Sequence, residues 1–402
     1  MRKLLLTALA LAVTGCGGPE ADRITLLDVP AGAEAAGPRL TSSPQGEVVL
    51  SWMEPDDSGT TLLYATLAED SWSSTRAIVS GKHMFVNWAD LPSVMHVSGE
   101  HWAAHWLEMA GDTTYAYHVV MSQSFDSGAA WSAPVKPHTD GTPTEHGFVS
   151  IFPSDKGLTA IWLDGRKMVN EATDDPMDTG MTLRTATVDN EGTLHREQQI
   201  DDLVCDCCQT DAALTAAGPV VLYRNRTTQE IRDIHVGRLT EAGWQTGESL
   251  HDDNWNIAGC PVNGPAVAAS GSRVAAAWFT AASGQPRVQL KFSDDGGSSF
   301  GNAIPVANSG VLGHVDTVLL GDGTAVVSWL ESGGGRLARL RVGRIAAGGS
   351  GEALTVADDV DPRSVPQMAL DGTRIVLVWT AYQGDKRHLR SGSVRVQELA
   401  ME

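Results

Sequence analysis

The sequence has few basic residues for its length. Its 402 residues include 29 lysines and arginines against 49 aspartates and glutamates, which gives a formal charge of −20 at pH 7. A chain with so few cations has no basic surface to displace the counterions of a nucleic acid, so we expect no nucleic-acid partner. The same deficit argues against docking of the folded domain on anionic lipid head groups. Cationic, neutral and sugar ligands fit this composition.

The motifs of several enzyme classes are also missing. The sequence contains no Gly-rich phosphate loop before a helix, no G-x-S-x-G segment and no H-E-x-x-H pair, which are signatures of P-loop enzymes, serine hydrolases and zinc proteases. No useful stretch has the period of an amphipathic helix. Instead, short alternating apolar runs recur between turn residues, and the chain holds 42 glycines and 12 tryptophans. This pattern is typical of a turn-rich all-β fold.

The first residues have the pattern of an export signal. Two basic residues precede the apolar run Leu4–Val13, which is too short to span a bilayer as a helix. The segment VTGC that ends at Cys16 resembles the lipobox of bacterial lipoproteins, and an ordinary cleaved signal with a stray cysteine is the alternative. The resemblance implies a signal peptide over 1–15, a lipidated Cys16 and a tether over 16–22. Several acyl chains anchor a protein stably in a membrane, and Gly17 after the cysteine implies the outer membrane, on its periplasmic or outer surface.

A repeat organises the rest of the chain, 23–402. In each unit an apolar strand ends in an aromatic residue, and successive aromatics stand 50 to 61 residues apart. These marker aromatics are Trp52, Trp106, Trp162, Tyr223, Trp278, Trp329 and Trp379. Units of this kind are typical of four-stranded propeller blades, none of which can bury its faces alone. We therefore predict one all-β domain, a seven-bladed β-propeller whose last blade is completed by the early strand 23–29; a six-bladed ring with an extra hairpin is the alternative.

Two units carry a turn motif after the marker. The segments 124–131 and 293–300 both fit S-x-D-x-G-x-x-[WF]. In such a turn the Ser and Asp bind turn amides, the Gly takes a positive φ and the aromatic packs beneath. The motif resembles the Asp box of the sialidase-like (BNR/Asp-box repeat) β-propellers, and the resemblance spans nearly the whole chain after the tether. The resemblance implies the β-propeller architecture more strongly than it implies sialidase activity, because Asp boxes lie on the propeller face opposite the active site.

The resemblance implies a set of sialidase residues that this sequence supplies only in part. A sialidase binds the substrate carboxylate with three arginines, uses a Tyr-Glu nucleophile and an Asp acid/base, and carries its first arginine in an Arg-Ile-Pro motif. That motif is absent; Arg39 stands in Pro-Arg-Leu instead. The densest cluster of arginines and carboxylates is 223–233, for which a surface ion-pair ladder is the alternative explanation. The candidate catalytic residues are Asp164, Arg224, Arg226 and Glu230.

Carboxylates follow four of the marker aromatics by two residues. They are Glu54, Glu108, Asp164 and Glu331. In a propeller the loops after the second strands and the loops that lead into the inner strands open on the same face. The spacing therefore predicts an acidic rim that attracts cations or amines, with solvated turn residues as the alternative. Polar side chains near the starts of the inner strands give a second set of expected ligand contacts, namely Asp90, Asp206, Asp211, Asn263 and Asp316.

The cysteines after the tether gather at the same end of the channel. Cys205 and Cys260 each stand 18 residues before a marker aromatic, so in an exported protein we predict a Cys205–Cys260 disulfide with a vicinal Cys207–Cys208 bridge. A second interpretation keeps Cys207 and Cys208 as thiolates that bind copper or zinc together with two histidines. A thiol-redox pair is the third. The metal ligands of the second interpretation are Cys207, Cys208, His146 and His314.

Together these patterns predict a monomeric, lipid-anchored, extracytoplasmic propeller. Its first function is to bind a glycan or related ligand at the channel mouth formed by blades three to six, and in the enzymatic version to hydrolyse it as an exo-sialidase-like glycoside hydrolase. The competing classes are a metal or thiol-redox protein and a propeller that only docks a partner, since this fold serves many functions.

Overall fold

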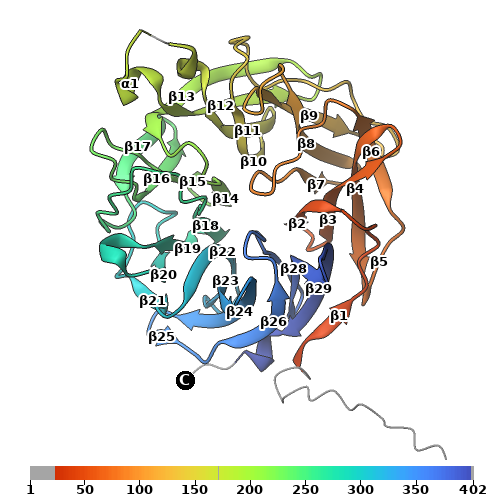
Figure 1. Ribbon diagram of the computed structural model, residues 1–402, viewed down its shortest axis with the longest axis vertical. Helices are drawn as coiled ribbons and strands as arrows, with labels where there is room; N and C mark the ends of the chain where they lie inside the picture. Colours follow the sequence, from red (N-terminus) through yellow and green to blue (C-terminus); the bar gives the residue numbers. More distant parts are fainter. Residues whose placement is uncertain (1–22, 171, 400–402) are drawn as a thin grey trace, which may run out of the picture.

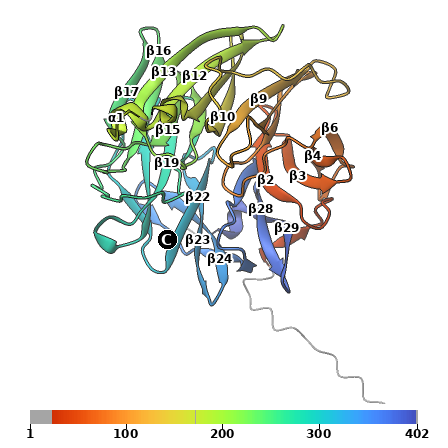
Figure 2. The same cartoon turned by 45° about the horizontal axis from the view of Figure 1, so that its top comes forward.

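The structure, a computed structural model, describes residues 23–170 and 172–399, which form strands arranged in antiparallel sheets around a central axis (Figure 1). The oblique view in Figure 2 shows the sheets standing side by side around the ring. One nine-stranded sheet contains two blades, joined through the single pair Val360 and Ala381. The predicted seven-bladed β-propeller is therefore confirmed. The signal peptide, Cys16 and the tether lie outside the described residues.

The first four blades follow the chain from the inner strand outward. They are β2 (Ala36–Ser42), β3 (Val48–Asp56), β4 (Gly59–Ala68), β5 (Ser71–Trp72) and β6 (Arg76–Gly81); β7 (Ser93–Ser98), β8 (His101–Met109) and β9 (Tyr117–Ser124); β10 (His146–Ser154), β11 (Gly157–Asp164), β12 (Met181–Asp189) and β13 (Leu194–Val204); and β14 (Asp211–Thr215), β15 (Gly218–Arg224), β16 (Ile234–Thr240) and β17 (Gly243–Ser249). Blade two has three strands, and the single bridge between Met121 and Val135 stands where the others have a fourth.

The last three blades repeat the order. They are β18 (Ala266–Ser270), β19 (Arg273–Thr280), β20 (Arg287–Ser293) and β21 (Ile304–Ala307); β22 (Val311–Leu319), β23 (Ala325–Gly334), β24 (Leu337–Ala346), β25 (Gly349–Ser350) and β26 (Leu354–Val360); and β27 (Gln367–Asp371), β28 (Arg374–Gln383), β29 (Lys386–Arg395) and β1 (Thr25–Leu27). Short helical turns are η2 (Arg166–Val169), α1 (Pro176–Thr179), η3 (Ala282–Gly284) and η4 (Val396–Glu398). None of the helices in the described ranges is long and apolar enough to cross a membrane.

The ring closes with strands from both ends of the described chain. β1 pairs with β29 in antiparallel register from Thr25 opposite Ser393 to Leu27 opposite Ser391. In Figure 1 the red β1 accordingly lies beside the blue β29. This pairing covers the backbone groups that β29 would otherwise leave unpaired at a sheet edge. The prediction that the segment 23–29 completes the last blade is confirmed.

The core consists of seven apolar clusters, each between two neighbouring blades. Every cluster holds one marker aromatic, which comes from the second strand of its blade and packs against the preceding blade. Trp278 of blade five, for example, packs with Val220 and Leu222 of blade four. All seven marker aromatics are at most 2% exposed. A second strand is covered on both faces, which explains why its sequence is a nearly continuous apolar run.

The buried indoles explain the carboxylates that follow them. The indole N–H of Trp52, Trp106, Trp162 and Trp329 donates to the carboxylate two residues later, at 2.8 to 3.0 Å. Trp278 donates to Asp253 instead, and the Tyr223 hydroxyl donates to Asp201. A buried polar hydrogen needs such a partner. We therefore assign Glu54, Glu108, Asp164 and Glu331 a structural role in place of the expected cation-attracting rim.

The two predicted motif turns have the same internal hydrogen bonds. Ser124 donates to Asp126 at 2.8 Å and accepts the Gly128 N–H at 2.8 Å. The turn at 293–300 repeats both bonds, at 2.7 and 2.9 Å. The glycine takes a positive φ of 76° in the first turn and 83° in the second, a conformation that costs glycine little. The turn chemistry expected from the sequence is therefore present in both segments.

The indole hydrogen bond can be tested by comparing two tryptophans that are equally buried. Trp329 donates to Glu331, whereas the Trp379 indole nitrogen has no partner among the described residues. Both Trp329→Phe and Trp379→Phe lose ring volume, but only the first removes a hydrogen bond. We expect Trp329→Phe to lower the free energy of unfolding by about 1 kcal/mol more than Trp379→Phe. Urea denaturation measures the difference, and equal losses would contradict the structural role of the carboxylate.

Candidate functional site

Polar side chains near the starts of the inner strands bind the backbone of the next blade. Asp90 accepts the Phe148 N–H and Asn263 accepts the His314 N–H, both at 2.7 Å. Phe148 and His314 have positive φ values of 55° and 53°. Each follows a glycine at which a Cβ would lie 2.0 Å from the accepting oxygen. These close approaches make Asp90 and Asn263 connectors between blades.

Two further carboxylates, which line a cavity in the channel, make the same kind of connection. Asp211 accepts the Val267 N–H at 2.7 Å, and Asp316 accepts the Met368 N–H at 2.5 Å. Asp90, Asp211, Asn263 and Asp316, which the sequence predicts as ligand contacts, thus each make a contact between blades. This use could not be read from the sequence, because the partners are backbone amides more than 50 residues away.

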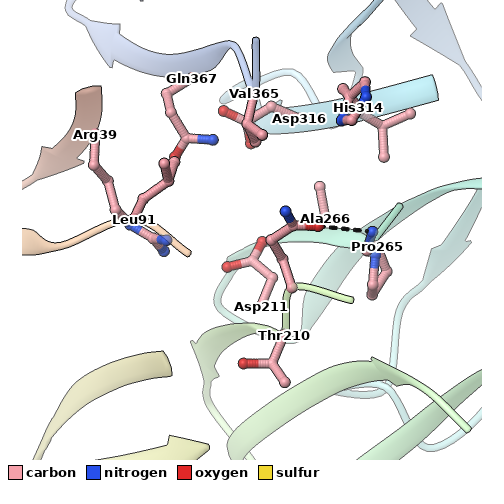
Figure 3. Close-up of a pocket in the computed structure, with 13 residues that line it drawn as sticks. Arg39, Leu91, Thr210, Asp211, Pro265, Ala266, His314, Asp316, Val365 and Gln367 are labelled. Atoms are coloured by element: carbon pink, nitrogen blue, oxygen red, sulfur yellow. Dashed lines mark hydrogen bonds between the residues drawn. The ribbon is translucent and has the colours of Figure 1, made fainter. Parts of the chain in front are cut away.

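A small cavity lies in the channel among these residues (Figure 3). Figure 3 shows Arg39 reaching into it from one side and Asp211 from another. Its volume of about 50 Å³ suits a few water molecules. Burial raises the pKa of Asp211 to about 6 and that of Asp316 to about 7, although Arg39 and the amide hydrogen bonds oppose the rise. The cavity is thus lined by polar groups that include two carboxyls with raised pKa.

The segment 86–91 of blade two lies across the mouth of the channel. The Trp88 ring is 6.2 Å from that of His314 on blade six. The Gln209 side chain of blade four donates to the Ala89 carbonyl at 2.7 Å. Leu91 lines the cavity below. This segment, which we name the cover, therefore connects opposite sides of the ring above the cavity.

A cleft beside the cover presents an aromatic ring and two arginines to solvent. Trp88 is 40% exposed, and the side chains of Arg363 and Arg387 are 49% and 45% exposed. Both arginines pair with the carboxylate of Asp361, which is buried, at 3.6 and 2.6 Å. The start of β2 forms the opposite wall. We name this feature the Trp88 cleft, and it is the candidate ligand site.

Sequence reasoning placed the site on blades three to six and missed the Trp88 cleft, which lies over blades seven and one. One signal was available, because Arg363 stands 16 residues before Trp379, in the phase of the loops that lead into inner strands. Asp361 and Trp88 share this phase, because each stands 18 residues before a marker aromatic, whereas Arg387 has no such signal. Arg387 is on β29, and the cover brings Trp88 in from blade two.

Two of the candidate catalytic residues are occupied inside the protein. Arg224 is 1% exposed, donates to the carbonyls of Arg232, Asn263 and Phe279, and stacks on Trp255. A guanidinium whose donors are used in this way cannot bind a ligand. Asp164 is fully buried and forms two hydrogen bonds of 2.7 Å with Arg166. Burial raises the pKa of Asp164, but Arg166 outweighs it and holds this pKa below its usual value. Both roles are structural.

The other two candidates form an ion-pair ladder. Arg226 binds Glu230 at 2.6 Å and Asp206 at 3.3 Å, and Arg232 binds Glu230 at 2.8 Å. Their charges therefore compensate one another, as the alternative explanation of this cluster expected. Partly exposed pairs of this kind contribute little each. The charged groups of Arg226, Glu230 and Asp206 are paired with one another, and their arrangement does not point to a ligand.

A hydrogen-bonded Tyr-Glu pair is present at a place that the sequence did not suggest. The Tyr117 hydroxyl donates to Glu145. Burial raises the pKa of Glu145 to about 7. Tyr117, however, has no exposed surface and stacks on Phe85 at 4.2 Å. A nucleophile must contact its substrate, so this pair does not supply the nucleophile that the sialidase resemblance implies.

The cysteines pair differently from the prediction. Cys207 forms the disulfide with Cys260, whereas Cys205 and Cys208 are buried with their sulfurs 2.7 Å apart. The predicted Cys205–Cys260 and Cys207–Cys208 bridges are therefore wrong. The physical reason is the turn after β13, which directs Cys205 inward to Arg232, at 3.5 Å from its sulfur, and leaves Cys207 facing blade five. Burial raises the pKa of Cys205, but its hydrogen bond with Cys208 and the charge of Arg224 lower it to about 6.

The four expected metal ligands do not come together. Cys207 is in the disulfide and Cys208 is buried beside Cys205. His314 lies under the cover next to Trp88. His146 lies instead beside two other histidines, His118 and His138, between blades two and three. The predicted site is therefore wrong as a set, and only His146 is among ligand-type neighbours.

Comparisons with solved structures agree with this fold. An unknown-function protein from Dyadobacter fermentans is 13% identical with a TM-score of 0.51, covering 93% of this chain and 95% of its own. The endosialidase of phage phi92 is 10% identical with a TM-score of 0.50, covering 93% and 69%. A puromycin-hydrolysing peptidase from Mycobacterium tuberculosis is 12% identical with a TM-score of 0.52, covering 92% of this chain and 53% of its own.

No protein family and no curated protein matches the chain by sequence. Identities this low establish the fold alone, which is a β-propeller. This similarity in fold does not assign an activity.

The buried carboxylates of the channel predict a pH effect on stability. Asp316 has its pKa raised from 3.8 to about 7. The stability that this group contributes is thus fully present below about pH 3.8 and is lost as the pH rises through about 7. Asp316→Asn keeps an oxygen for the Met368 amide and removes the charge. We expect the variant to gain stability over the parent between pH 4 and pH 7, by at most about 1.4 kcal/mol per pH unit. Melting curves across this range provide the measurement, and a difference that does not change with pH would contradict the assignment.

Proposed function

We propose that this protein binds an acidic glycan, one that carries a carboxylate on its terminal sugar, in the Trp88 cleft. The observation that carries the proposal is the exposed Trp88 indole beside two half-exposed arginines. A partly exposed tryptophan beside a few convergent polar groups is typical of ligand sites. Its flat face suits the apolar face of a sugar ring.

The two arginines supply the polar half of the proposed site. A guanidinium forms two parallel hydrogen bonds with a carboxylate, and it does so better than lysine. Buried Asp361 holds Arg363 and Arg387 in place by ion pairs, so little side-chain freedom is lost when the ligand binds. The three groups together carry one net positive charge. A single carboxylate matches that charge, whereas a polyanion is opposed by the formal charge of −20.

Binding is supported more than hydrolysis. Most glycosidases need two carboxyl groups that flank the scissile bond, and a sialidase needs a Tyr-Glu nucleophile and an Asp acid/base. In the Trp88 cleft the carboxylate is Asp361, which is buried under its two arginines. Glu145 has a raised pKa that suits an acid, but its partner Tyr117 is fully buried. We therefore propose that the propeller binds a glycan. A turnover assay tests whether it also hydrolyses the glycan.

The proposal includes the cellular location expected from the N-terminal sequence. The lipobox-like segment ending at Cys16 favours export and acylation, which would keep the propeller at the outer membrane. The disulfide between Cys207 and Cys260 is compatible with an oxidising compartment outside the cytoplasm.

Binding in the Trp88 cleft is tested with sialyllactose, a uronic-acid oligosaccharide and neutral lactose. We expect the acidic sugars to bind better than lactose. Trp88→Ala should lower the affinity for an acidic sugar about tenfold, which corresponds to about 1.4 kcal/mol. Arg363→Ala should weaken acidic sugars and leave lactose unchanged. Isothermal titration calorimetry measures these affinities.

The matched control is Phe125→Ala. Phe125 is 45% exposed and lies in a motif turn away from the Trp88 cleft, so its removal should leave binding unchanged. Loss of binding in this variant, or no binding of any tested acidic sugar by the parent, would refute the proposal. Release of fluorophore from a fluorogenic sialoside by the parent would add hydrolysis to binding.

The lipid anchor is tested by Cys16→Ser. Serine cannot form the thioether through which the cysteine carries its lipid, so the variant should move from the detergent phase to the aqueous phase in phase partitioning and should lose incorporation of labelled fatty acid. The parent, expressed in the same way, is the reference. Equal partitioning of the two proteins would remove the anchor from the proposal.

A further inference from the structure

A separate cluster of histidines lies between blades two and three. His118 is near the start of β9, His138 is in the segment 125–145 that follows β9, and His146 is the first residue of β10. One ring nitrogen from each of the three lies within 4.8 Å of the others. The ring centres are 3.9 to 5.5 Å apart. Three successive segments of the chain thus bring three imidazoles into contact.

Both nitrogens of His146 face hydrogen-bond acceptors. Nδ1 is 2.9 Å from the Thr144 carbonyl, and because a carbonyl only accepts, Nδ1 carries a hydrogen. Nε2 is 3.2 Å from an oxygen of Asp140 and 3.7 Å from one of Asp164. A neutral ring would therefore point a lone pair at two carboxylates. The arrangement calls for a cation at Nε2, either a second proton or a metal ion.

The two other histidines leave nitrogens without partners. Nε2 of His138 and Nδ1 of His118 are buried and have no hydrogen-bond partner among the described residues. His138 is 4% exposed, whereas His118 is partly exposed and gives the cluster contact with solvent. A buried polar atom without a partner is unfavourable. Two such nitrogen atoms beside His146 indicate that a ligand of the cluster is missing, such as a metal ion that would accept their lone pairs.

The charges around the cluster suit a cation. Asp140 and Asp164 both face His146. Arg166 pairs with Asp164 and Glu197, each at 2.7 Å, and approaches Asp140 at 3.4 Å. These contacts of Arg166 are with carboxylate oxygens, so it leaves the ring nitrogens unsatisfied. Asp140 is also 2.9 Å from Nδ1 of His138, the contact by which carboxylates commonly orient metal-binding histidines.

We propose that His118, His138 and His146 bind a divalent transition-metal ion, with zinc as the reference ion, and that Asp140 positions the histidines. Imidazole nitrogens suit zinc and copper. His146 contributes Nε2, because its Nδ1 is held by the carbonyl. The rings of His138 and His146 stack at 3.9 Å with 5° between their planes, so binding turns the His138 ring toward the shared ion. The turn breaks no hydrogen bond of Nε2 of His138, which has no partner among the described residues.

The metal would fasten this segment to blade three. The segment is held to β9 by the bridge between Met121 and Val135, where other blades have a full strand pair. An ion shared by His118 of β9, His138 of the segment and His146 of β10 would join all three. The site is independent of the Trp88 cleft, and either proposal can fail without the other.

The test uses the full chain, purified without a histidine tag and treated with a chelator. We expect calorimetry to show one zinc ion bound per chain, and zinc to raise the melting temperature. His138→Gln and His118→Gln should each lower the zinc affinity at least about tenfold, and Asp140→Asn about 10- to 100-fold. His83→Gln, which changes an exposed histidine outside the cluster, should have no effect. Circular dichroism of the metal-free variants checks that each one folds.

Cobalt substitution keeps the proposal testable if a histidine variant does not fold. Cobalt bound to the parent should give the visible absorption of a site with nitrogen and oxygen ligands. An intense sulfur-to-cobalt charge-transfer band would place the ion at the cysteines and overturn the proposal. Zinc binding that is equal in the parent and in His138→Gln, or no stoichiometric binding by the parent, would also overturn it and leave a second proton on His146 as the cation.

Discussion

The propeller depends on one aromatic side chain at each contact between blades. A single blade cannot bury both faces of its sheet, so each second strand inserts a tryptophan or tyrosine into an apolar cluster of the preceding blade. Such a residue brings a polar hydrogen into the core. In six of the seven interfaces a carboxylate accepts that hydrogen. The spacing of the repeat and the recurring carboxylates thus have one cause.

The same requirement explains the polar residues that line the channel. Seven inner strands meet around the axis without pairing their backbones continuously, so amide groups there need partners. Asp90, Asp211, Asn263 and Asp316 supply them across blade boundaries. Polar residues that converge on a channel look like a binding site in sequence, but here they hold the ring together. What faces solvent is the cover and the Trp88 cleft beside it.

Both proposed sites use the irregular parts of blade two. The cover brings Trp88 to blades six and seven, and the segment 125–145 brings His138 to blade three. A repeated blade constrains nearly every residue by packing, whereas a long connection carries side chains that packing does not fix. A rigid ring with a few such segments can therefore acquire a site without a change in its core.

The sequence by itself determined the class and number of blades, because hydrophobic burial recurs at each blade and leaves one aromatic per repeat. It also predicted the closing strand and the two motif turns, whose hydrogen bonds are local. It could not identify the partners of polar residues. The pairing of Cys207 with Cys260 depends on which way one turn faces, and the isolation of Arg224 depends on carbonyls of distant strands. The Trp88 cleft and the histidine cluster needed the tertiary structure, because the repeat phase of Trp88, Asp361 and His146 does not show which segments of neighbouring blades they meet.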